Sequence, residues 1–333
     1  MRAAVIESAN EPLVLKDLPV PEPGPGQVRI AIRASGICGT DLHVWHGLFP
    51  VELPIVPGHE PVGIVDAIGD GVRSVRPGDR VGVSWAQRGC GTCPMCQKLK
   101  AKYCEESITW ANLGGGHQEF MLAEETGCTL IPDAVSFEVA APLFCAGFTV
   151  VSGYRNARPR PGDRVAVIGI GGLGHLALQV AKANGHEVIA ITSSANKRDE
   201  ALSLGADEVL VVAKHAGEEL AAMGGADVVI STSNGMEQNS QVLYGLRPEG
   251  RMVTMAVGAK PIQVDPTLAL SKQISLIGSM QNNREDMVEA LDLAAAGKLK
   301  PALETYELDQ VNEAMARLAE GKVRYRAVLR IAE

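Results

Sequence analysis

Apolar residues alternate with polar or small ones along one short stretch near the start of the chain, and two stretches after it are also predicted to be strands. The stretch Val28–Ala34 alternates apolar residues with polar or small ones, which is the period of two expected of a half-buried strand. Gly63–Gly69 and Asp79–Val83 are predicted to be two further strands, joined through the turn sequence Arg76-Pro77-Gly78-Asp79. Residues 1–150 are therefore expected to be rich in strands and turns.

The pattern changes after residue 160. Arg164–Ile168 is apolar after its first residue, as in a buried strand, and the helix-like stretch Leu173–Ala183 follows it. A strand at His186–Ile191 and a helix at Lys197–Leu204 repeat this order. Further strands are predicted at Glu208–Val212, Asp227–Ile230, Arg251–Val257 and Ile274–Ile277. This alternation predicts an α/β fold with a doubly wound parallel sheet over residues 151–285.

The C-terminal part, residues 286–333, has a different pattern of apolar and polar residues. Helices are predicted at Glu285–Ala296 and Gln310–Glu320, and a closing strand at Ala327–Ile331. The chain is thus expected to form two domains of ordinary size.

Composition and charge narrow the function classes. Of the 333 residues, 46% are hydrophobic and 21% are charged, which is typical of a folded globular protein. A formal net charge of −8 disfavours a broad surface for nucleic acid or anionic lipid. Neither a signal peptide nor a transmembrane stretch is apparent. We therefore expect a cytoplasmic protein with no nucleic-acid or membrane partner.

A glycine-rich segment joins the first buried strand to the helix after it. Gly169, Gly171 and Gly174 form the pattern G-x-G-x-x-G, with Gly172 and Leu173 between them. The first glycine permits a tight turn, the second lets a pyrophosphate approach the backbone, and the third lets the helix pack closely on the strand. The helix N-terminus offers amide donors to the phosphates. The segment predicts a dinucleotide site.

The end of the second strand bears on which nicotinamide dinucleotide would bind. An acidic residue about 20 positions after the glycines would bind the ribose 2′-hydroxyl of NAD. Here the strand instead leads into hydroxyls and cations, and no acid follows until Asp199: Thr192, Ser193, Ser194, Lys197 and Arg198. These groups suit a 2′-phosphate, so NADP is favoured over NAD. Alternatively, Lys197 and Arg198 only open a solvated helix.

Four of the seven cysteines lie in one short segment with the spacing C-x2-C-x2-C-x7-C: Cys90, Cys93, Cys96 and Cys104. Four thiolates on short loops can close a tetrahedral zinc site with no open position, so the zinc would be structural. An iron–sulfur cluster is the alternative, although its usual final spacing followed by proline is absent. Taken singly, Cys38, His59 and Cys145 are more typical of buried residues than of ligands.

With these motifs in this order, the sequence resembles the zinc-dependent medium-chain alcohol dehydrogenases over almost its whole length. The resemblance is carried by Gly36–His43, Gly58-His59-Glu60, the four-cysteine segment, Leu143–Gly147 and the glycine pattern. It implies a GroES-like, β-rich catalytic domain formed by residues 1–150 and 286–333. A Rossmann cofactor-binding domain, residues 151–285, would be inserted between them.

The resemblance also implies a catalytic zinc held by Cys38, His59 and Cys145, with Glu60 beside it. Asp41 would orient His59. Together with the four-cysteine site, this implies two Zn²⁺ per chain.

Further roles follow from the same resemblance. Thr40 would hydrogen-bond the alcohol oxygen, and His43 would pass the proton to solvent through the cofactor ribose. Arg326 would contact the pyrophosphate, and Ser193 would contact the 2′-phosphate of NADP. The substrate pocket would be lined by Phe49, Trp85 and Trp110.

We therefore expect an alcohol dehydrogenase or aldehyde reductase that transfers hydride between a primary alcohol and NADP. The alternatives are an NAD-dependent secondary-alcohol or polyol dehydrogenase of the same family, and a non-catalytic cofactor-binding protein. A homo-oligomer, dimer or tetramer, is expected. The stretch Ala111–His117 is expected to be a loop with a solvated His117, and Cys128 a core residue.

Overall fold

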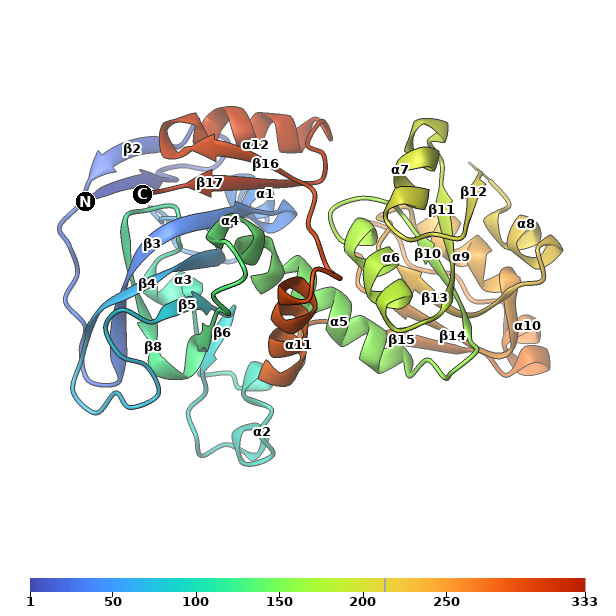
Figure 1. Cartoon of the computed structure of the whole chain (residues 1–333), viewed down its shortest axis with the longest axis horizontal. Coiled ribbons are helices and arrows are strands. Elements are labelled where there is room, and N and C mark those ends of the chain that lie inside the picture. Colours follow the sequence, from blue (N-terminus) through green and yellow to red (C-terminus); the bar gives the residue numbers. More distant parts are fainter. Residues whose placement is uncertain (213, 333) are drawn as a thin grey trace. The chain divides into compact units, whose positions relative to one another are not determined.

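The computed structural model of the chain describes residues 1–212 and 214–332. The chain divides into two compact units, Met1–Cys145 with Pro301–Glu333, and Ala146–Lys300 (Figure 1). The helix α11 (Arg284–Ala295), expected in the C-terminal return, belongs to the second unit. It does so because its buried Asp286 accepts hydrogen bonds from Ser152 and Arg155 of α5 (Ala146–Ala157).

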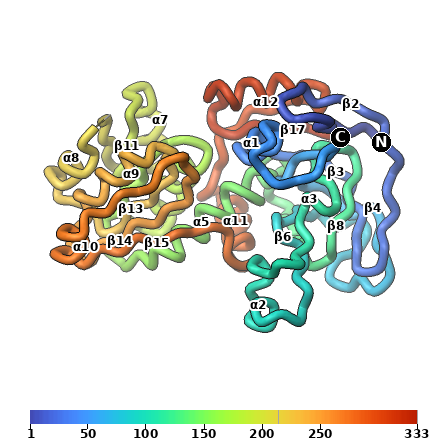
Figure 2. Tube along the Cα trace, turned by 180° about the vertical axis from the view of Figure 1, so that it is seen from behind, coloured from blue at the N-terminus to red at the C-terminus, as the bar shows by residue number. Residues whose placement is uncertain are grey.

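The first unit contains a seven-stranded, largely antiparallel sheet with the order β16-β17-β3-β4-β5-β9, in which β8 also pairs with β3. Its strands are β3 (Gln27–Ile37), β4 (Glu60–Ile68), β5 (Arg80–Val83), β8 (Phe120–Glu124), β9 (Cys128–Leu130), β16 (Leu303–Glu307) and β17 (Arg326–Arg330). The predicted alternation is present in β3, where Val28, Ile30 and Ile32 are fully buried. Figure 2 shows the C-terminal strand β17 beside β3.

Smaller elements complete this unit. Two-stranded sheets are formed by β1 (Arg2–Val5) with β2 (Val14–Asp17) and by β6 (Ala86–Arg88) with β7 (Ile108–Thr109). The helices are α1 (Gly39–Trp45), α2 (Pro94–Gln97), α3 (Trp110–Leu113), α4 (Phe137–Ala140) and α12 (Val311–Ala319). Short 3-10 turns occur at Ala101–Tyr103, Glu125–Gly127, Ala141–Phe144 and Leu308–Gln310. Cys128 is buried in the core, as predicted.

The second unit is a doubly wound parallel sheet with the order β12-β11-β10-β13-β14-β15. Its strands are β10 (Arg164–Ile168), β11 (Glu187–Thr192), β12 (Glu208–Val211), β13 (Ala226–Ser231), β14 (Leu246–Thr254) and β15 (Ser275–Gly278). The predicted strand Arg251–Val257 is shifted, because β14 already pairs with β13 at Leu246, and Val257 is 76% exposed.

Helices cover both faces of this parallel sheet (Figure 1). They are α6 (Gly174–Ala183), α7 (Arg198–Ser203), α8 (Ala216–Ala222), α9 (Met236–Val242) and α10 (Pro266–Lys272), with 3-10 turns at Ala195–Lys197 and Leu243–Gly245. Ala166 and Ile168 of β10 share a buried cluster with α8, α9 and α10. Strands buried on both faces explain the continuous apolar runs in the sequence.

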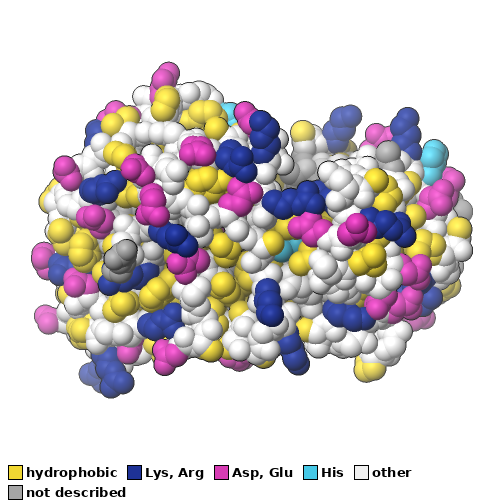
Figure 3. Space-filling model, turned by 45° about the horizontal axis from the view of Figure 1, so that its top comes forward, with side chains coloured by type: hydrophobic (Ala, Val, Ile, Leu, Met, Phe, Trp, Pro, Cys, Tyr) yellow, Lys and Arg dark blue, Asp and Glu magenta, His cyan; other side chains and the backbone are white. Residues whose placement is uncertain are grey.

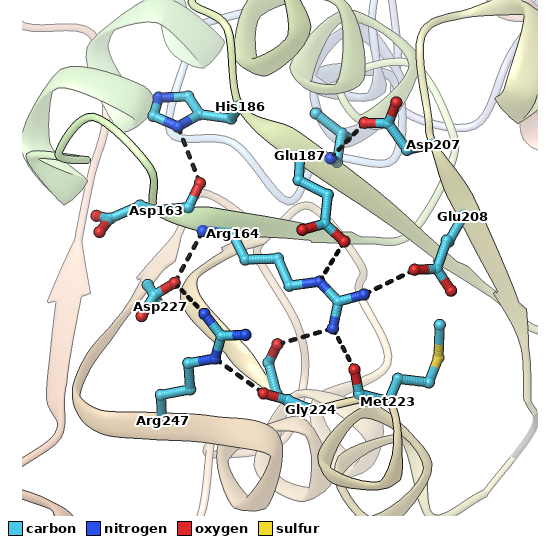
Figure 4. A network of polar contacts seen from close by, with 12 residues as sticks. Asp163, Arg164, His186, Glu187, Asp207, Glu208, Met223, Gly224, Asp227 and Arg247 are labelled. Carbon is cyan, nitrogen blue, oxygen red and sulfur yellow. Dashed lines mark hydrogen bonds and ion pairs between the residues drawn. The ribbon is translucent and has the colours of Figure 1, made fainter.

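A polar network joins the amino ends of the neighbouring strands β10, β11 and β12 (Figure 4). The Arg164 guanidinium at the start of β10 donates to Glu187 and Glu208, at the starts of β11 and β12, over 2.7 Å in each case. It also donates to the carbonyls of Met223 and Gly225. The network thus holds the amino ends of these strands together, at the end of the sheet opposite the glycine turn.

On the face drawn in Figure 3, Lys and Arg side chains are interspersed with Asp and Glu. Within the described residues, no single helix is both long and apolar enough to cross a membrane. One helix pair meets the length and composition together, but it is broken at Cys145 and belongs largely to the buried core.

Candidate functional site

Four side chains from distant parts of the first unit converge on one point. One ligand atom from each of Cys38, His59, Glu60 and Cys145 lies within 4.8 Å of all the others. Cys38 follows β3, His59 lies directly before β4, Glu60 is the first residue of β4, and Cys145 follows the turn Ala141–Phe144. The Cys38 and Cys145 sulfurs are 3.8 Å apart, although 107 positions separate them in sequence.

Asp41 supports this cluster from the first turn of α1. One carboxylate oxygen accepts the Cys38 amide at 2.8 Å, which forms a capping box at the helix start. The other oxygen accepts the Gly58 amide at 3.1 Å and lies 3.7 Å from His59 Nδ1. Asp41 is fully buried, so it faces His59 without competition from water.

The chemistry of the donors fits a zinc ion. Neither ring nitrogen of the buried His59 has a hydrogen-bond partner among the described residues. Contact with Cys145 lowers the pKa of Cys38, and the same contact raises the pKa of Cys145. Burial opposes charge on His59, but Asp41 raises its pKa well above the ordinary value. Two sulfurs and an imidazole with unused lone pairs are the ligand types that catalytic zinc takes.

The carboxylate of Glu60 is paired with the guanidinium of Arg326. Gly36 of β3 lies opposite Glu60, and any Cβ there would overlap the carboxylate, so glycine makes room for it. The Arg326 guanidinium donates to Glu60, and both side chains are almost fully buried. Burial raises the pKa of Glu60, and Arg326 opposes that rise. The pyrophosphate role predicted for Arg326 stays a prediction; in this structure its guanidinium faces Glu60.

The predicted pocket aromatics gather around His59. The Trp85 ring lies 5.2 Å from the His59 ring and 5.4 Å from that of Phe49, in edge-to-face geometry. Trp110, 5.7 Å from Trp85, is buried behind it. Thr40 and His43 lie on α1, the first half-buried and the second exposed.

The four clustered cysteines form a second donor set. The sulfurs of Cys90, Cys93, Cys96 and Cys104 all lie within 4.8 Å of one another. Backbone amides of Cys93 and Cys96 point at the preceding sulfurs at 3.3 and 3.4 Å, and the Thr92 hydroxyl lowers the pKa of Cys90 to about 6. Four sulfurs this close suit one tetrahedral zinc with no open position.

In the second unit, the glycine turn has the geometry that its pattern requires. Gly169 has φ +91°, and a Cβ on Gly174 would lie 1.9 Å from the Gly169 carbonyl oxygen. A Cβ on Gly171 would meet nothing within 4 Å, so the backbone there is open to an approaching group. Gly172 and Leu173 lead into α6, whose N-terminus follows directly.

A cavity of about 300 Å³ lies at this turn. Its lining includes five of the predicted cofactor residues: Gly169, Thr192, Ser193, Ser194 and Lys197. Lys197 Nζ donates to the Ile170 carbonyl at 2.6 Å. Arg198 does not line this cavity, because its guanidinium is held by the Val209 carbonyl at 3.1 Å. Of the predicted pair of cations, the structure therefore places only Lys197 along the cavity.

Several contributors were missed from the sequence. Ser233 and Gln238 also line the cavity, and no motif marked them. His117, expected to be solvated, is fully buried, and burial lowers its pKa to about 4. The run of glycines before His117 was the available signal, because such a run permits close backbone packing.

Comparison with known proteins agrees with this geometry. Residues 24–133 match the family model "Alcohol dehydrogenase GroES-like domain", and residues 172–296 match "Zinc-binding dehydrogenase". An alcohol dehydrogenase of Geobacillus stearothermophilus is 36% identical over 99% of this chain and 100% of its own length.

Two solved structures show the same fold over nearly the whole chain. A cinnamyl alcohol dehydrogenase from Sorghum bicolor has a TM-score of 0.90 and 32% identity, covering 99% of this chain and 97% of its own. An acetophenone reductase from Geotrichum candidum, in complex with NAD, has a TM-score of 0.87 and 30% identity, with the same coverage. The chain therefore belongs to the zinc-dependent medium-chain alcohol dehydrogenase family, whose enzymes use a nicotinamide dinucleotide.

Proposed function

We propose that this protein oxidises primary alcohols, or reduces their aldehydes, with a preference for NADP(H). The proposal is carried by the cofactor cavity: its described lining residues offer the hydroxyls of Thr192, Ser193 and Ser194 and the ammonium of Lys197, and include no carboxylate. A 2′-phosphate would gain charge-assisted hydrogen bonds from such groups. An NAD site would instead be expected to offer an acid to the 2′-hydroxyl.

Cys38, His59 and Cys145 would hold the catalytic zinc, and Glu60 lies beside them. A zinc ion there supplies a Lewis acid that lowers the pKa of a nearby alcohol. Asp41 keeps the His59 ring oriented, and Arg326 neutralises the Glu60 carboxylate. With zinc bound, two thiolates would balance the charge of the ion, and the carboxylate–arginine pair adds none, so the cluster would carry little excess charge.

Thr40 and His43 provide the route for the alcohol proton. They are three residues apart on α1, a spacing that places side chains on one face of a helix. Thr40 accepts the alcohol proton in a hydrogen bond, and His43, exposed to water, releases it to solvent. A bound nicotinamide would supply the acceptor for the hydride from the alcohol carbon.

The aromatic rings of Phe49 and Trp85, packed edge-to-face near His59, support unbranched or aromatic substrates. Likeness to an acetophenone reductase in complex with NAD favours the second candidate, an NAD-dependent secondary-alcohol dehydrogenase.

We also propose that the protein is a homo-oligomer. The edge strand β15 has a free side in the described sheet, and apolar side chains on and near it are well exposed: Leu276 at 43% and Leu270 at 81%. Light scattering of the purified protein should give a multiple of 35.1 kDa. A monomer that stays active would contradict this part of the proposal.

The deciding experiment measures zinc per chain together with initial rates on primary alcohols, secondary alcohols and aldehydes, using NADP and NAD in parallel. We expect two zinc ions and a kcat/KM with NADP at least ~10-fold higher, equivalent to ~1.4 kcal/mol of discrimination. Faster turnover of secondary alcohols with NAD would instead establish the second candidate. One zinc per chain without turnover would contradict both.

A further inference from the structure

A buried histidine outside the donor set lies against the segment that presents His59. His117 follows Gly114–Gly116 and has no exposed surface. Three successive amides of this loop bond to the segment 56–58: Gly115 to the Val56 carbonyl at 2.8 Å, Gly116 to Gly58 at 2.7 Å and His117 to Pro57 at 3.1 Å. The two segments are therefore docked along their backbones.

Glycines allow this close approach. A Cβ on Gly115 would lie 2.2 Å from the Pro57 carbonyl oxygen, and one on Gly116 would lie 2.5 Å from Pro61 Cβ. Gly58 has φ +99°, and a Cβ there would lie 2.3 Å from His117 Nδ1. The imidazole thus fills the space directly above Gly58.

Gly58 is held from two sides. Its amide donates to Asp41, and its other side is covered by the His117 ring. That ring is itself anchored, because His117 Nδ1 lies 3.0 Å from Ser35 Oγ, and Ser35 is fully buried on β3 opposite Pro61. Ser35 and His117 therefore connect β3, the glycine loop and the residue just before His59.

The His59 ring has no comparable hydrogen bond of its own. Neither of its nitrogens has a hydrogen-bond partner among the described residues, and Asp41 is 3.7 Å away. Besides the attraction of Asp41, its orientation therefore depends on the backbone at Gly58 and on packing against Trp85 and Trp110. A displacement of Gly58 would turn His59 away from the two thiols.

We propose that His117 is a positioning residue for the metal ligand His59: its imidazole, anchored by Ser35, keeps Gly58 in place and so keeps the His59 ring aligned with Cys38 and Cys145. The inference rests on the ligand set proposed above. It goes beyond that set because His117 contacts neither an expected ligand atom nor the cofactor turn.

The test follows release of zinc to a chromogenic chelator from folded wild type and from His117→Ala, His117→Phe and His117→Asn. Alanine removes both volume and polar atom, phenylalanine keeps the volume, and asparagine keeps a polar atom near Nδ1. Loss of supporting groups around a metal ligand typically costs 10–100-fold in affinity. We expect release from the Cys38–His59–Cys145 site to be about 10-fold or more faster in His117→Ala, intermediate in His117→Phe and nearest to wild type in His117→Asn.

Release from the four-cysteine site should be unchanged in every variant, which makes it an internal reference. His46→Ala, which removes an exposed histidine of the same unit, is the matched control and should behave as wild type. In cobalt-substituted protein, the visible spectrum of the cysteine–histidine site should shift in His117→Ala and in Ser35→Ala.

If His117→Ala does not fold, the phenylalanine and asparagine variants decide. Wild-type release rates and an unchanged cobalt spectrum in the folded variants would overturn the role of His117. A wild type that binds only one metal would instead refute the ligand set itself, so the two failures are distinguishable.

Discussion

Single residues in this protein acquire their chemistry from neighbours far away in the sequence. Cys38 and Cys145 are unremarkable as single cysteines, yet their sulfurs lie 3.8 Å apart beside His59. Cys128, by contrast, is a cysteine of the same unit that is buried among apolar side chains. A substitution at Cys128 is therefore a matched control for the same substitution at Cys145.

The substitution Cys145→Ala should remove one metal per chain and lower kcat at least ~100-fold. Loss of a residue that only supports a metal ligand already costs up to about 100-fold in activity, and loss of the ligand itself should cost no less. Cofactor affinity, measured by fluorescence titration, should stay within about twofold, since Cys145 lies outside the cofactor cavity. Cys128→Ala should keep both metals and turnover. Retained turnover in Cys145→Ala would exclude it as a catalytic ligand.

At Ser193, one side chain should control the choice of dinucleotide. Ser193→Asp places a carboxylate in the cavity, which repels a 2′-phosphate and accepts a hydrogen bond from a free 2′-hydroxyl. The ratio of kcat/KM for NADP to that for NAD should fall by about 10-fold or more, in keeping with ~1.4 kcal/mol for one charged contact. The same change at Ser203, an exposed serine of α7, should leave the ratio unaltered. An unaltered ratio in Ser193→Asp would show that this loop does not discriminate.

At the scale of elements, the strand starts of the parallel sheet depend on Arg164. Arg164→Met would leave the carbonyls of Met223 and Gly225 without this donor (Figure 4). The free energy of unfolding of the second unit should fall by about 1–3 kcal/mol. The cofactor KM should change little, because the network is at the amino ends of the strands and the cavity is at their carboxyl ends.

Urea unfolding measures this loss. Arg76→Met, which removes an exposed arginine that pairs with Asp79 across a turn, should cost less than about 0.5 kcal/mol. Equal unfolding midpoints for the two variants would mean that the network adds nothing beyond a surface ion pair.

The segment around α2 has few buried side chains to stabilise it. None of the residues of α2 is buried, and Lys98 and Lys100 are exposed. Its order should therefore depend on the ion held by the four cysteines. Chelation, or Cys93→Ser, should speed tryptic cleavage after Lys98 and Lys100 about 10-fold. This corresponds to a decrease of ~1.4 kcal/mol in the free energy needed to open the segment locally. Added zinc should restore resistance in wild type only; equal cleavage with and without metal would contradict a structural ion.

For the molecule as a whole, carboxylates in both units should make stability fall in acid. Backbone amides of Ser74 and Arg73 lower the pKa of Glu125, and the Thr267 amide lowers the pKa of Asp265. Partial burial by itself would raise the pKa of Asp207, but Lys182 and the Val188 amide outweigh it and lower that pKa. A carboxylate whose pKa is lower in the folded state binds fewer protons there than in the unfolded state.

These carboxylates therefore contribute stability above the unfolded pKa values of about 4, and that contribution is lost as the pH falls through their folded values. The melting temperature should therefore drop as the pH falls below about 4, the range in which these carboxylates take up protons. Glu125→Gln should make the acid drop shallower, as judged by calorimetry across this range. A melting temperature that rises on acidification would contradict the sign of these shifts.

The amino-acid sequence by itself determined the classes of structure and of chemistry. Alternation with a period of two marked β3, and continuous apolar runs marked the strands of the parallel sheet. These patterns can be recognised locally, because successive side chains of a strand point to opposite faces, so residues of one face recur at every second position. The four-cysteine segment and the glycine turn were visible for the same reason: their groups are neighbours in sequence.

Only the tertiary structure decided which distant side chains meet. Cys38, His59 and Cys145 come from three separate segments, and their convergence depends on the pairing of β3 with β4 and on the turn before Cys145. Arg198 was predicted to face the cofactor but binds the Val209 carbonyl, and His117 was expected in solvent but covers Gly58. Burial and partners of a polar side chain are set by segments packed against it from elsewhere in the chain, which local patterns do not encode.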